Sequence, residues 1–547
     1  MVPIKQDILL IFILKSESMG LKYFSLIIYF GLLIACTAEK QEADQNALSD
    51  TLYHEQHRPQ FHFSPPRNWM NDPNGLVYFD GEYHLFYQHY PDSNVWGPMH
   101  WGHAVSIDLV HWENLPIAIY PDSAGYIFSG SAVVDEKNSS GLGTGTQPPL
   151  VAMYTIHDPM KQQAGRNDYE SQGIAYSNDK GGTWTKYTGN PVIPNPGNER
   201  DFRDPKVTWD EGSGQWVVVL AVKDHVAFWG SSDLKSWHHL SDFGTSLGSH
   251  GGVWECPDLF PLQCTESGET KWVLIVNINP GGPNGGSGSQ YFIGQWDGTT
   301  FSPDADFIPF VTNEQGVWLD FGKDDYAGVT WSNAPLSPDQ RLWIGWMSNW
   351  EYATVVPTTA WRSACTLPRE LRLVHTESGF RLASDPVATL QQLRQQPLRT
   401  APGVIDSILV LGKVPSMFEL ELDLQLPESG DFSVGLILEN DSEESYRIGF
   451  DGHSNRFYSD RMAAGDHSFS DRFASAIHTA PRQSDSRHLQ MHLYFDVSSV
   501  ELFADDGSMV LTEIYFPSAP FSQVKLQAKG EPVKLSEATI YPLQSIW

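Results

Sequence analysis

Three short acidic motifs lie far apart in the chain, and each stands at the head of the same strand pattern. They are Trp-Met-Asn-Asp-Pro-Asn-Gly at 69–75, Arg-Asp-Pro at 203–205 and Glu-Cys-Pro at 255–257. Each is followed by an apolar run, a Gly-containing turn and a second apolar run, which is the pattern of a β-hairpin. An acid that opens the same hairpin three times predicts a repeated unit that brings Asp72, Asp204 and Glu255 to a common centre. Paired carboxylates at such a centre are the groups that hydrolyse sugar bonds.

The bulk composition narrows the class of partner. The chain has 547 residues, more than one ordinary core, which predicts two domains. Its formal net charge of -31 argues against nucleic acid, whose phosphates need a basic surface, and against docking on anionic lipid heads. This charge neither favours nor opposes the binding of a neutral sugar. The 19 Trp residues offer ring faces on which sugars stack.

The first 36 residues are predicted to be a targeting segment outside the fold. Lys22 precedes an apolar stretch, 23–34, which ends in Leu-Ile-Ala-Cys at 33–36. This ending resembles the lipobox of bacterial lipoproteins, in which the cysteine, here Cys36, becomes the lipidated first residue of the mature chain. The stretch is shorter than the about 20 apolar residues of a spanning helix. An ordinary cleaved signal or a membrane anchor is the alternative, and Met19 is a second candidate start.

Residues 37–55 are polar and acidic, which suits a flexible tether. The predicted location is therefore the bacterial cell envelope, on its periplasmic side or at the cell surface, with the lipid anchor as the sole membrane contact. Beyond Cys36 the chain has three cysteines, too few for a disulfide framework. A Cys256–Cys264 bridge is the pairing that an oxidising compartment would permit.

Residues 56–380 are predicted to be an all-β domain. Short β-rich runs alternate with Gly, Asp, Asn and Pro turns, and no helical periodicity is sustained. A second repeat, Ser-x-Asp followed by Trp, predicts turns between outer strands; it occurs at 106–112, 177–184 and 231–237.

Five predicted inner strands suggest a five-bladed β-propeller. Their starts lie about 50 to 75 residues apart, the size of a four-stranded blade. They are at Asp72, the Phe-Ser-Gly-Ser run at 128–131, Asp204, Glu255 and the segment 320–326. Five blades around one axis would aim all five starts into a single funnel.

The pattern changes near residue 380. Residues 381–398 are predicted to be a linker with a short helix over 385–397. From residue 418 onward apolar and polar residues alternate in evenly spaced runs, which predicts a β-sandwich over 399–547. This domain offers no catalytic constellation, so a structural role is expected.

Together the motifs resemble the β-fructofuranosidase family, which includes invertases, levanases and exo-inulinases. The resemblance continues, in order, through Gly-Trp-Met at 345–347, Trp-Arg-Ser at 361–363, Leu-Pro-Arg-Glu at 367–370, Val-Glu-Leu-Phe at 500–503 and Ile-Tyr-Phe-Pro at 514–517. It therefore covers nearly all of the chain past residue 56. It implies a five-bladed propeller followed by a C-terminal β-sandwich.

The resemblance also assigns roles. It makes Asp72 the nucleophile, Glu255 the general acid/base and Asp204 the stabiliser of the transition state, with Arg203 expected to keep Asp204 ionised. Matching residue by residue implies a fructose pocket formed by Trp69, Asn71, Gln88, Trp96, Phe128, Ser129, Arg203, Tyr326 and Trp346. Packing between blades is the alternative for Trp96 and Trp346. No cofactor is required, because the chemistry is acid–base and nucleophilic. His100, His103 and His111 have no matching carboxylate spacing for a zinc site.

The implied activity is a retaining exo-β-fructosidase acting on levan, inulin or sucrose. The intact Asn-Asp-Pro-Asn core favours exo action, whereas Pro98, where relatives often carry Asn, leaves chain-length preference open. Two rivals stay open: a fructosyltransferase on the same scaffold, and a fructan-binding surface lipoprotein without catalysis.

Overall fold

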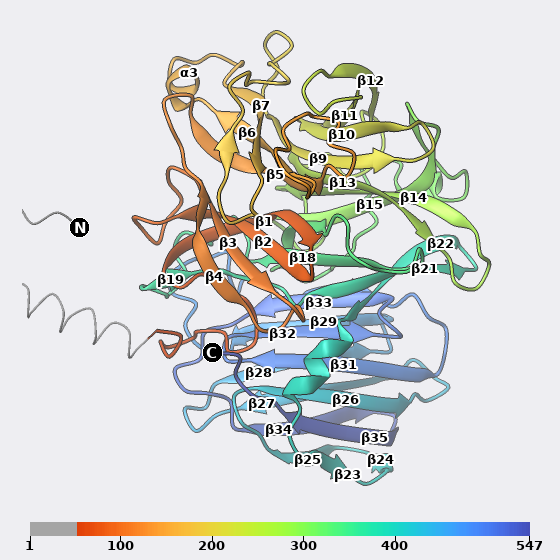
Figure 1. Cartoon of the computed structure of the whole chain (residues 1–547). Coiled ribbons are helices and arrows are strands. Elements are labelled where there is room, and N and C mark those ends of the chain that lie inside the picture. The colour runs from red at the N-terminus through yellow and green to blue at the C-terminus, as the bar shows by residue number, and fades with distance from the viewer. Residues whose placement is uncertain (1–51) are drawn as a thin grey trace, which may run out of the picture. The chain divides into compact units, whose positions relative to one another are not determined.

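The computed structural model describes residues 52–547, and residues 56–547 form one compact unit (Figure 1). The predicted signal segment, Cys36 and most of the predicted tether lie outside the described residues. Within the described part, helical structure is confined to α3 (Pro159–Gln163) and two 3-10 turns, η1 (Ile308–Phe310) and η2 (Ala388–Leu393). None of the described helices is long and apolar enough to cross a membrane.

The first 22 strands form five sheets, each with four main strands that follow one another along the chain. The first sheet contains β1 (Asn68–Phe79), β2 (Glu82–Tyr90), β3 (His100–Ser106) and β4 (Glu113–Ile119); the second contains β5 (Tyr126–Val134), β6 (Leu150–His157), β7 (Glu170–Ser177) and β8 (Thr185–Lys186); the third contains β9 (Phe202–Asp210), β10 (Gln215–Val222), β11 (His225–Ser231) and β12 (His238–Phe243); the fourth contains β13 (Val253–Gln263), β14 (Thr270–Asn279), β15 (Gly288–Trp296) and β16 (Phe301–Pro303); the fifth contains β17 (Tyr326–Thr330), β18 (Arg341–Met347), β21 (Arg369–Thr376) and β22 (Gly379–Pro386), with β20 (Ala364–Cys365) beside β18.

These sheets are the five blades of a propeller. The inner strands β1, β5, β9, β13 and β17 contact one another in turn, and β17 contacts β1, which closes the ring. The chain also returns to the first blade, because β19 (Trp361–Arg362) pairs in parallel with β1. The Ser-x-Asp repeat forms turns between third and fourth strands, as predicted: Ser106 Oγ and Asp108 Oδ1 accept backbone N–H groups of that turn, and Ser231 and Asp233 do the same.

Every inner strand has a β-bulge at the same height, a feature that is common beside active sites. In each bulge two inner-strand residues face one residue of the neighbouring strand. The sets are Asn71 and Asp72 opposite Gln88, Phe128 and Ser129 opposite Thr155, Asp204 and Pro205 opposite Leu220, Cys256 and Pro257 opposite Val276, and Ala327 and Gly328 opposite Gly345. The predicted inner-strand starts of the first four blades therefore coincide with the bulges or their neighbours.

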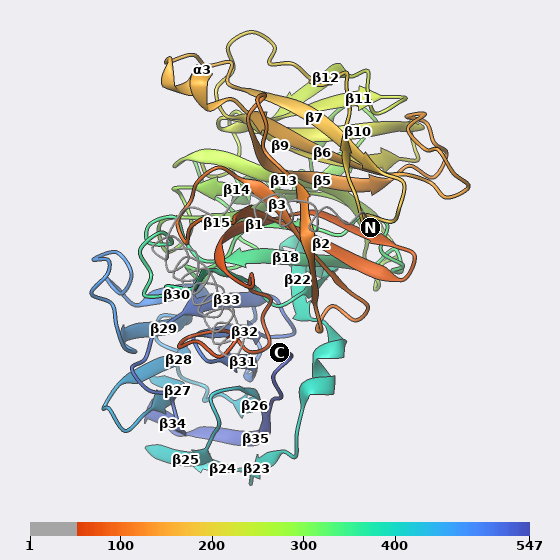
Figure 2. The ribbon, with the colours of Figure 1, turned by 60° about the vertical axis from the view of Figure 1, so that its left-hand side comes forward.

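The remaining strands form two sheets, coloured from teal to blue in Figures 1 and 2, that pack as a sandwich. One contains β23 (Leu398–Thr400), β24 (Gly403–Ile405), β26 (Phe418–Gln425), β31 (His488–Asp496), β32 (Ser499–Ala504), β33 (Met509–Ile514) and β35 (Val533–Pro542); the other contains β25 (Ile408–Lys413), β27 (Phe432–Glu439), β28 (Ser445–Asp451), β29 (Arg456–Ala463), β30 (His478–Pro481) and β34 (Gln523–Gly530). Alternate residues such as Leu420, Leu422 and Leu436 form their shared core. The predicted propeller and sandwich are confirmed.

The chain between the two sets of sheets is shorter and less helical than predicted. β22 runs to Pro386, past the expected propeller end at 380, and the helix expected over 385–397 is the 3-10 turn η2. Its buried Leu390 and Leu393 pack in a cluster that also contains propeller residues.

The segment before β17 is tied to the sandwich. The backbone N–H of Phe321 donates to Val510 O at 2.9 Å, and that of Asp324 donates to Thr512 O at 3.1 Å, both on β33. The Asp324 carboxylate also pairs with buried Arg461, at 2.5 Å. Because β17 begins at Tyr326, the sandwich fixes where the fifth inner strand starts.

Candidate active site

Asp72 lies in the bulge of β1, and three neighbours orient its carboxylate. Asn71 Nδ2 donates to Oδ1 at 2.9 Å, while Ser129 Oγ, from the bulge of β5, donates to Oδ2 at 2.6 Å. The thiol of Cys256, from the bulge of β13, contacts Oδ2 at 3.6 Å. Trp69 Nε1 holds Asn71 in turn, by a 2.7 Å bond to Asn71 Oδ1. Three blades therefore fix one partly exposed carboxylate.

Glu255 stands immediately before the bulge of β13, and both of its carboxylate oxygens accept hydrogen bonds. Arg203 Nη2 donates to Oε1 at 2.9 Å, and the hydroxyl of Tyr326 donates to Oε2. Burial raises the pKa of Glu255; Arg203 and Tyr326 oppose that rise, and the charge of Asp72 adds to it. A carboxyl with a raised pKa can carry a proton to a leaving group.

The guanidinium of Arg203 contacts several of the acidic side chains around the site. Its guanidinium lies 2.7 Å from Asp201 Oδ1 and 3.4 Å from Glu170 Oε1, in addition to its contact with Glu255. The nearest Asp204 oxygen is 3.9 Å from Arg203 Nε. The closest partners of Arg203 are therefore Asp201 and Glu255.

Asp204 is buried, in a left-handed backbone conformation with φ of 62°. Its Oδ2 accepts the Cys256 backbone N–H at 3.0 Å, and its own N–H donates to Thr155 Oγ1 at 2.9 Å. Burial raises its pKa to about 8, Arg203 lowers it only in part, and Glu255 and Asp72 add repulsion. This direction runs against the expectation that Arg203, 3.9 Å away, keeps Asp204 ionised, and pH-dependent melts of Asp204→Asn test it.

The bulges thus bring Asp72, Asp204 and Glu255 into one hydrogen-bonded and ion-paired cluster at one end of the propeller axis. Glu255 has donors on both oxygens and a raised pKa, and Asp72 has its carboxylate fixed in orientation. One carboxylate that can attack and one carboxylic acid that can give a proton are the two groups that retaining glycosidases need.

Two family models match the chain, and together they span the propeller and the sandwich. The model described as "Glycosyl hydrolases family 32 N-terminal domain" matches residues 62–386, and "Glycosyl hydrolases family 32 C terminal" matches residues 389–542. The chain belongs to glycosyl hydrolase family 32. This confirms the resemblance found in the motifs.

Named relatives agree with the family. The chain is 43% identical to a levanase of Bacillus subtilis over 530 residues, covering 96% of this chain and 75% of the relative. It is 39% identical to an extracellular exo-inulinase of Aspergillus awamori, covering 90% and 96% respectively. The crystal structure of exo-inulinase from Aspergillus awamori superposes with a TM-score of 0.84 at 37% identity, over 90% of this chain and all of that one.

The other residues predicted to form the fructose pocket lie around the same cluster, and some are buried while others are partly exposed. Trp346 is fully buried, and its ring centre lies 6.1 Å from that of Trp69 and 6.4 Å from that of Tyr326. Gln88 is buried opposite the bulge that contains Asp72. Both side chains are buried beside the cluster, and contact of Gln88 and Trp346 with a sugar stays a prediction.

Two aromatic residues remain partly open to solvent beside the cluster. Trp96 is 40% exposed and meets the ring of Phe128 edge-on at 6.0 Å. Phe128 in turn stacks on His157, with ring centres 4.2 Å apart. Contact of Trp96 with a sugar stays a prediction.

Several neighbours of the cluster were not predicted from the sequence. Cys256 was treated only as a possible disulfide partner, yet it is a free, buried cysteine that contacts both Asp72 and Asp204. Its place inside the Glu-Cys-Pro motif was an available signal. Asp201 and Glu170 bind Arg203, and Glu170 also accepts from His157 at 3.2 Å. Glu170 lies outside every motif, so only the fold could place it here.

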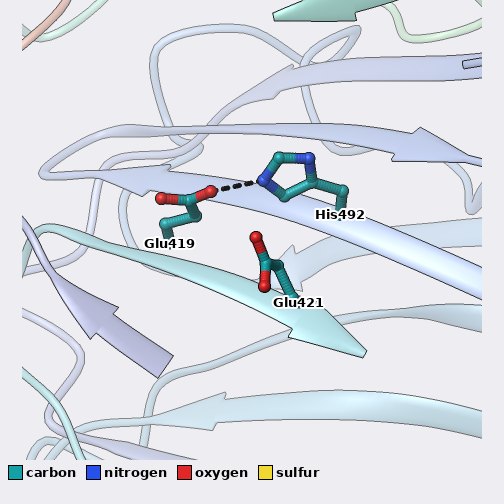
Figure 3. Close-up of side chains that lie close together, drawn as sticks. All are labelled: Glu419, Glu421 and His492. Carbon is teal, nitrogen blue, oxygen red and sulfur yellow. Dashed lines mark hydrogen bonds and ion pairs between the residues drawn. The ribbon is translucent and has the colours of Figure 1, made fainter. Parts of the chain in front are cut away.

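One cluster of possible metal-binding side chains occurs in the described residues, far from this site on the sandwich (Figure 3). Glu419 and His492 are hydrogen-bonded at 2.5 Å, with Glu421 beside them. Arg394 binds both carboxylates, at 2.7 Å to Glu419 Oε2 and 2.5 Å to Glu421 Oε1. Burial would raise the pKa of Glu419, but hydrogen bonds from His492 and Arg394 lower it. A cation would have to displace the guanidinium, so the cluster is an ion-pair network.

Proposed function

We propose that the chain is a retaining exo-β-fructosidase that hydrolyses terminal β-D-fructofuranosyl residues of fructans and sucrose. One observation carries the proposal: the inner strands of the first and fourth blades hold Asp72 close to a protonatable Glu255, and Cys256, the next residue after Glu255, contacts Asp72. Relatives named levanase, exo-inulinase and invertase support the choice of a fructosyl substrate.

In the first step Asp72 attacks the anomeric carbon of the terminal fructosyl unit. The bond from that carbon to the leaving oxygen breaks, and Glu255 transfers its proton to this oxygen. Asp204 has one carboxyl oxygen held by Cys256 N–H and the other available to the furanose hydroxyls. Hydrogen bonds to ring hydroxyls that strengthen as the ring becomes cationic lower the barrier.

In the second step water releases fructose from the Asp72 ester. Glu255, now a carboxylate, takes a proton from water, whose oxygen attacks the anomeric carbon and restores Asp72. The charge of Asp72 is one cause of the raised pKa of Glu255. Ester formation removes that charge, so Glu255 loses part of this rise when it must remain deprotonated. Two displacements at one carbon retain its configuration.

The mode of chain attack gives a first prediction. Because the Asn-Asp-Pro-Asn core is intact, free fructose is expected to dominate the early products from levan and inulin. Chromatography of timed samples measures this, with a family endo-fructanase as the reference digest. An oligosaccharide ladder ahead of fructose would contradict exo action, new oligosaccharides formed from sucrose would indicate a fructosyltransferase, and no products would indicate a binding protein.

We also propose that Cys36 is lipidated and holds the enzyme in the bacterial cell envelope, on the periplasmic side or at the surface. The apolar stretch and the Leu-Ile-Ala-Cys ending support this. Cys36→Ser is expected to abolish incorporation of labelled palmitate and to block normal maturation, whereas Cys365→Ser, a change at a buried cysteine of the fold, should leave labelling intact. Equal labelling of Cys36→Ser and the unsubstituted chain would contradict the anchor.

A further inference from the structure

A second polar cavity lies on the propeller axis beyond the catalytic cluster. It has a volume of about 400 Å³ and is lined by the far ends of β5, β9, β13 and β17. Lys206 lies two residues after Asp204, and Asp258 lies three residues after Glu255. At roughly 3.3 Å per strand residue, the cavity begins about 7 to 10 Å further along the axis.

Hydrogen bonds between neighbouring blades lie between the cavity and the active site. Ser131 Oγ donates to Pro205 O at 2.9 Å, and Asn277 Nδ2 donates to Cys256 O at 2.8 Å and to Gly328 O at 3.3 Å. Both side chains are buried and bridge neighbouring blades. The cavity is therefore a site of its own.

Asp258 presents an unmatched acceptor to this cavity. Its Oδ2 takes the N–H and hydroxyl of Thr330, at 2.7 and 2.8 Å, and the ammonium of Lys206 at 3.2 Å. Its Oδ1 is buried and accepts no hydrogen bond from the described residues. A buried carboxylate oxygen without a donor is unfavourable, so this atom favours a ligand that donates.

Arg341 presents unmatched donors to the same cavity. Its guanidinium stands 5.7 Å from the centre of the Phe260 ring, makes no hydrogen bond with the described residues, and is attracted by the charge of Asp258. The half-buried ring of Trp209 forms another part of the wall, with Lys137 Nζ 4.9 Å from its centre. The wall of the cavity therefore has a hydrogen-bond acceptor in Asp258, several hydrogen-bond donors in Arg341 and an aromatic ring in Trp209.

We propose that this cavity is a second carbohydrate site, which takes one neutral monosaccharide or polyol. Neighbouring hydroxyls can donate to Asp258 Oδ1 and accept from Arg341, because a hydroxyl does both, and the ring carbons can lie on Trp209. The lining carries both signs of charge: an anion would meet Asp258, Asp135, Glu136 and Glu211, and a cation would meet Arg341, Lys206 and Lys137. The volume lies within the range of small-molecule sites.

Calorimetric titration of the full chain with D-fructose tests the proposal. Two binding sites are expected in the unsubstituted chain, of which Arg341→Leu should lose one or weaken it at least tenfold. Turnover of sucrose should be unchanged in Arg341→Leu, because this residue lies outside the catalytic cluster. Arg399→Leu, at an exposed arginine paired with Glu537, is the matched control and should keep both sites.

A second measurement needs no substitution. Phenylglyoxal should modify Arg341, and D-fructose or D-glucose should protect it, as read by peptide mass spectrometry, while Arg399 stays unprotected. A single fructose site in the unsubstituted chain, two unaltered sites in a folded Arg341→Leu variant, or no protection of Arg341 would each overturn the second site.

Discussion

Asp72→Ala is expected to lose activity by several orders of magnitude on every fructoside, whereas Glu255→Ala should fail only where the leaving group needs a proton. Without Asp72 no fructosyl-enzyme forms. Without Glu255 the Asp72 carboxylate is still held by Asn71 and Ser129 and can attack. General acid assistance is worth roughly 10²–10⁴-fold, and a leaving group that departs as a stable anion does not require it.

Rapid-mixing kinetics with an activated fructoside measures the difference. Glu255→Ala should give a burst of leaving group followed by slow turnover, because the same residue activates water in the second step. Azide attacks without base assistance, so it should restore turnover of Glu255→Ala and give a β-fructosyl azide. Asp72→Ala should give no such retained product.

The control is Asp471→Ala, which removes an exposed carboxylate of the sandwich and should leave both steps unchanged. A retained azide from Asp72→Ala, and none from Glu255→Ala, would require the two roles to be exchanged. Full sucrose hydrolysis by Asp72→Ala would remove the nucleophile assignment altogether.

The sequence predicted the fold well because the order of apolar and polar residues in each strand indicates which of its faces is buried. Alternation at 418–424 is the buried pattern of β26, and the repeated acid-hairpin units are the inner strands of the blades. The bulges are harder to predict, since a bulge is a relation between two strands that only pairing reveals. The Pro residues in the short Asp-Pro and Cys-Pro motifs were the signal of these bulges in the sequence.

The electrostatics of the site were predicted less well, because they depend on distances between distant segments. Arg203 adjoins Asp204 in sequence, yet the bulge turns its guanidinium toward Asp201 and Glu255. The role of the segment 320–325 could not be predicted from the sequence either. Its buried acids pair with Arg369 and Arg461, and these ion pairs anchor the strand that contains Tyr326. The sandwich, which has no catalytic residue of its own, thereby helps to place the hydrogen-bond donor of Glu255.

Asp204→Asn should abolish most activity and yet stabilise the protein at neutral pH. The amide keeps the shape of the side chain and can accept from Cys256 N–H, but it does not reproduce the carboxyl that binds the changing ring. Loss of one such preorganised group lowers kcat by roughly 10²–10³-fold. Steady-state kinetics on sucrose measures this part.

The gain in stability follows from the pKa of Asp204, which burial raises from 3.8 to about 8. Below about pH 4 the carboxyl is protonated in both folded and unfolded chains, and its contribution to stability is fully present. Between about pH 4 and 8 the folded chain holds a proton that the unfolded chain has released, so the free energy of unfolding falls as pH rises, by up to about 1.4 kcal/mol per pH unit.

The amide introduced by Asp204→Asn has no proton to lose, so the melting temperature of this variant should match that of the unsubstituted chain near pH 4. It should then exceed it by an amount that grows to about pH 8 and levels off. Thermal melts across this range, with Asp471→Asn as the exposed control, measure the difference. A difference that shrinks with rising pH would mean that Asp204 is ionised in the folded enzyme and that Arg203 governs it after all. A growing difference together with lost activity would show that the site keeps a carboxyl which weakens the fold because catalysis requires it.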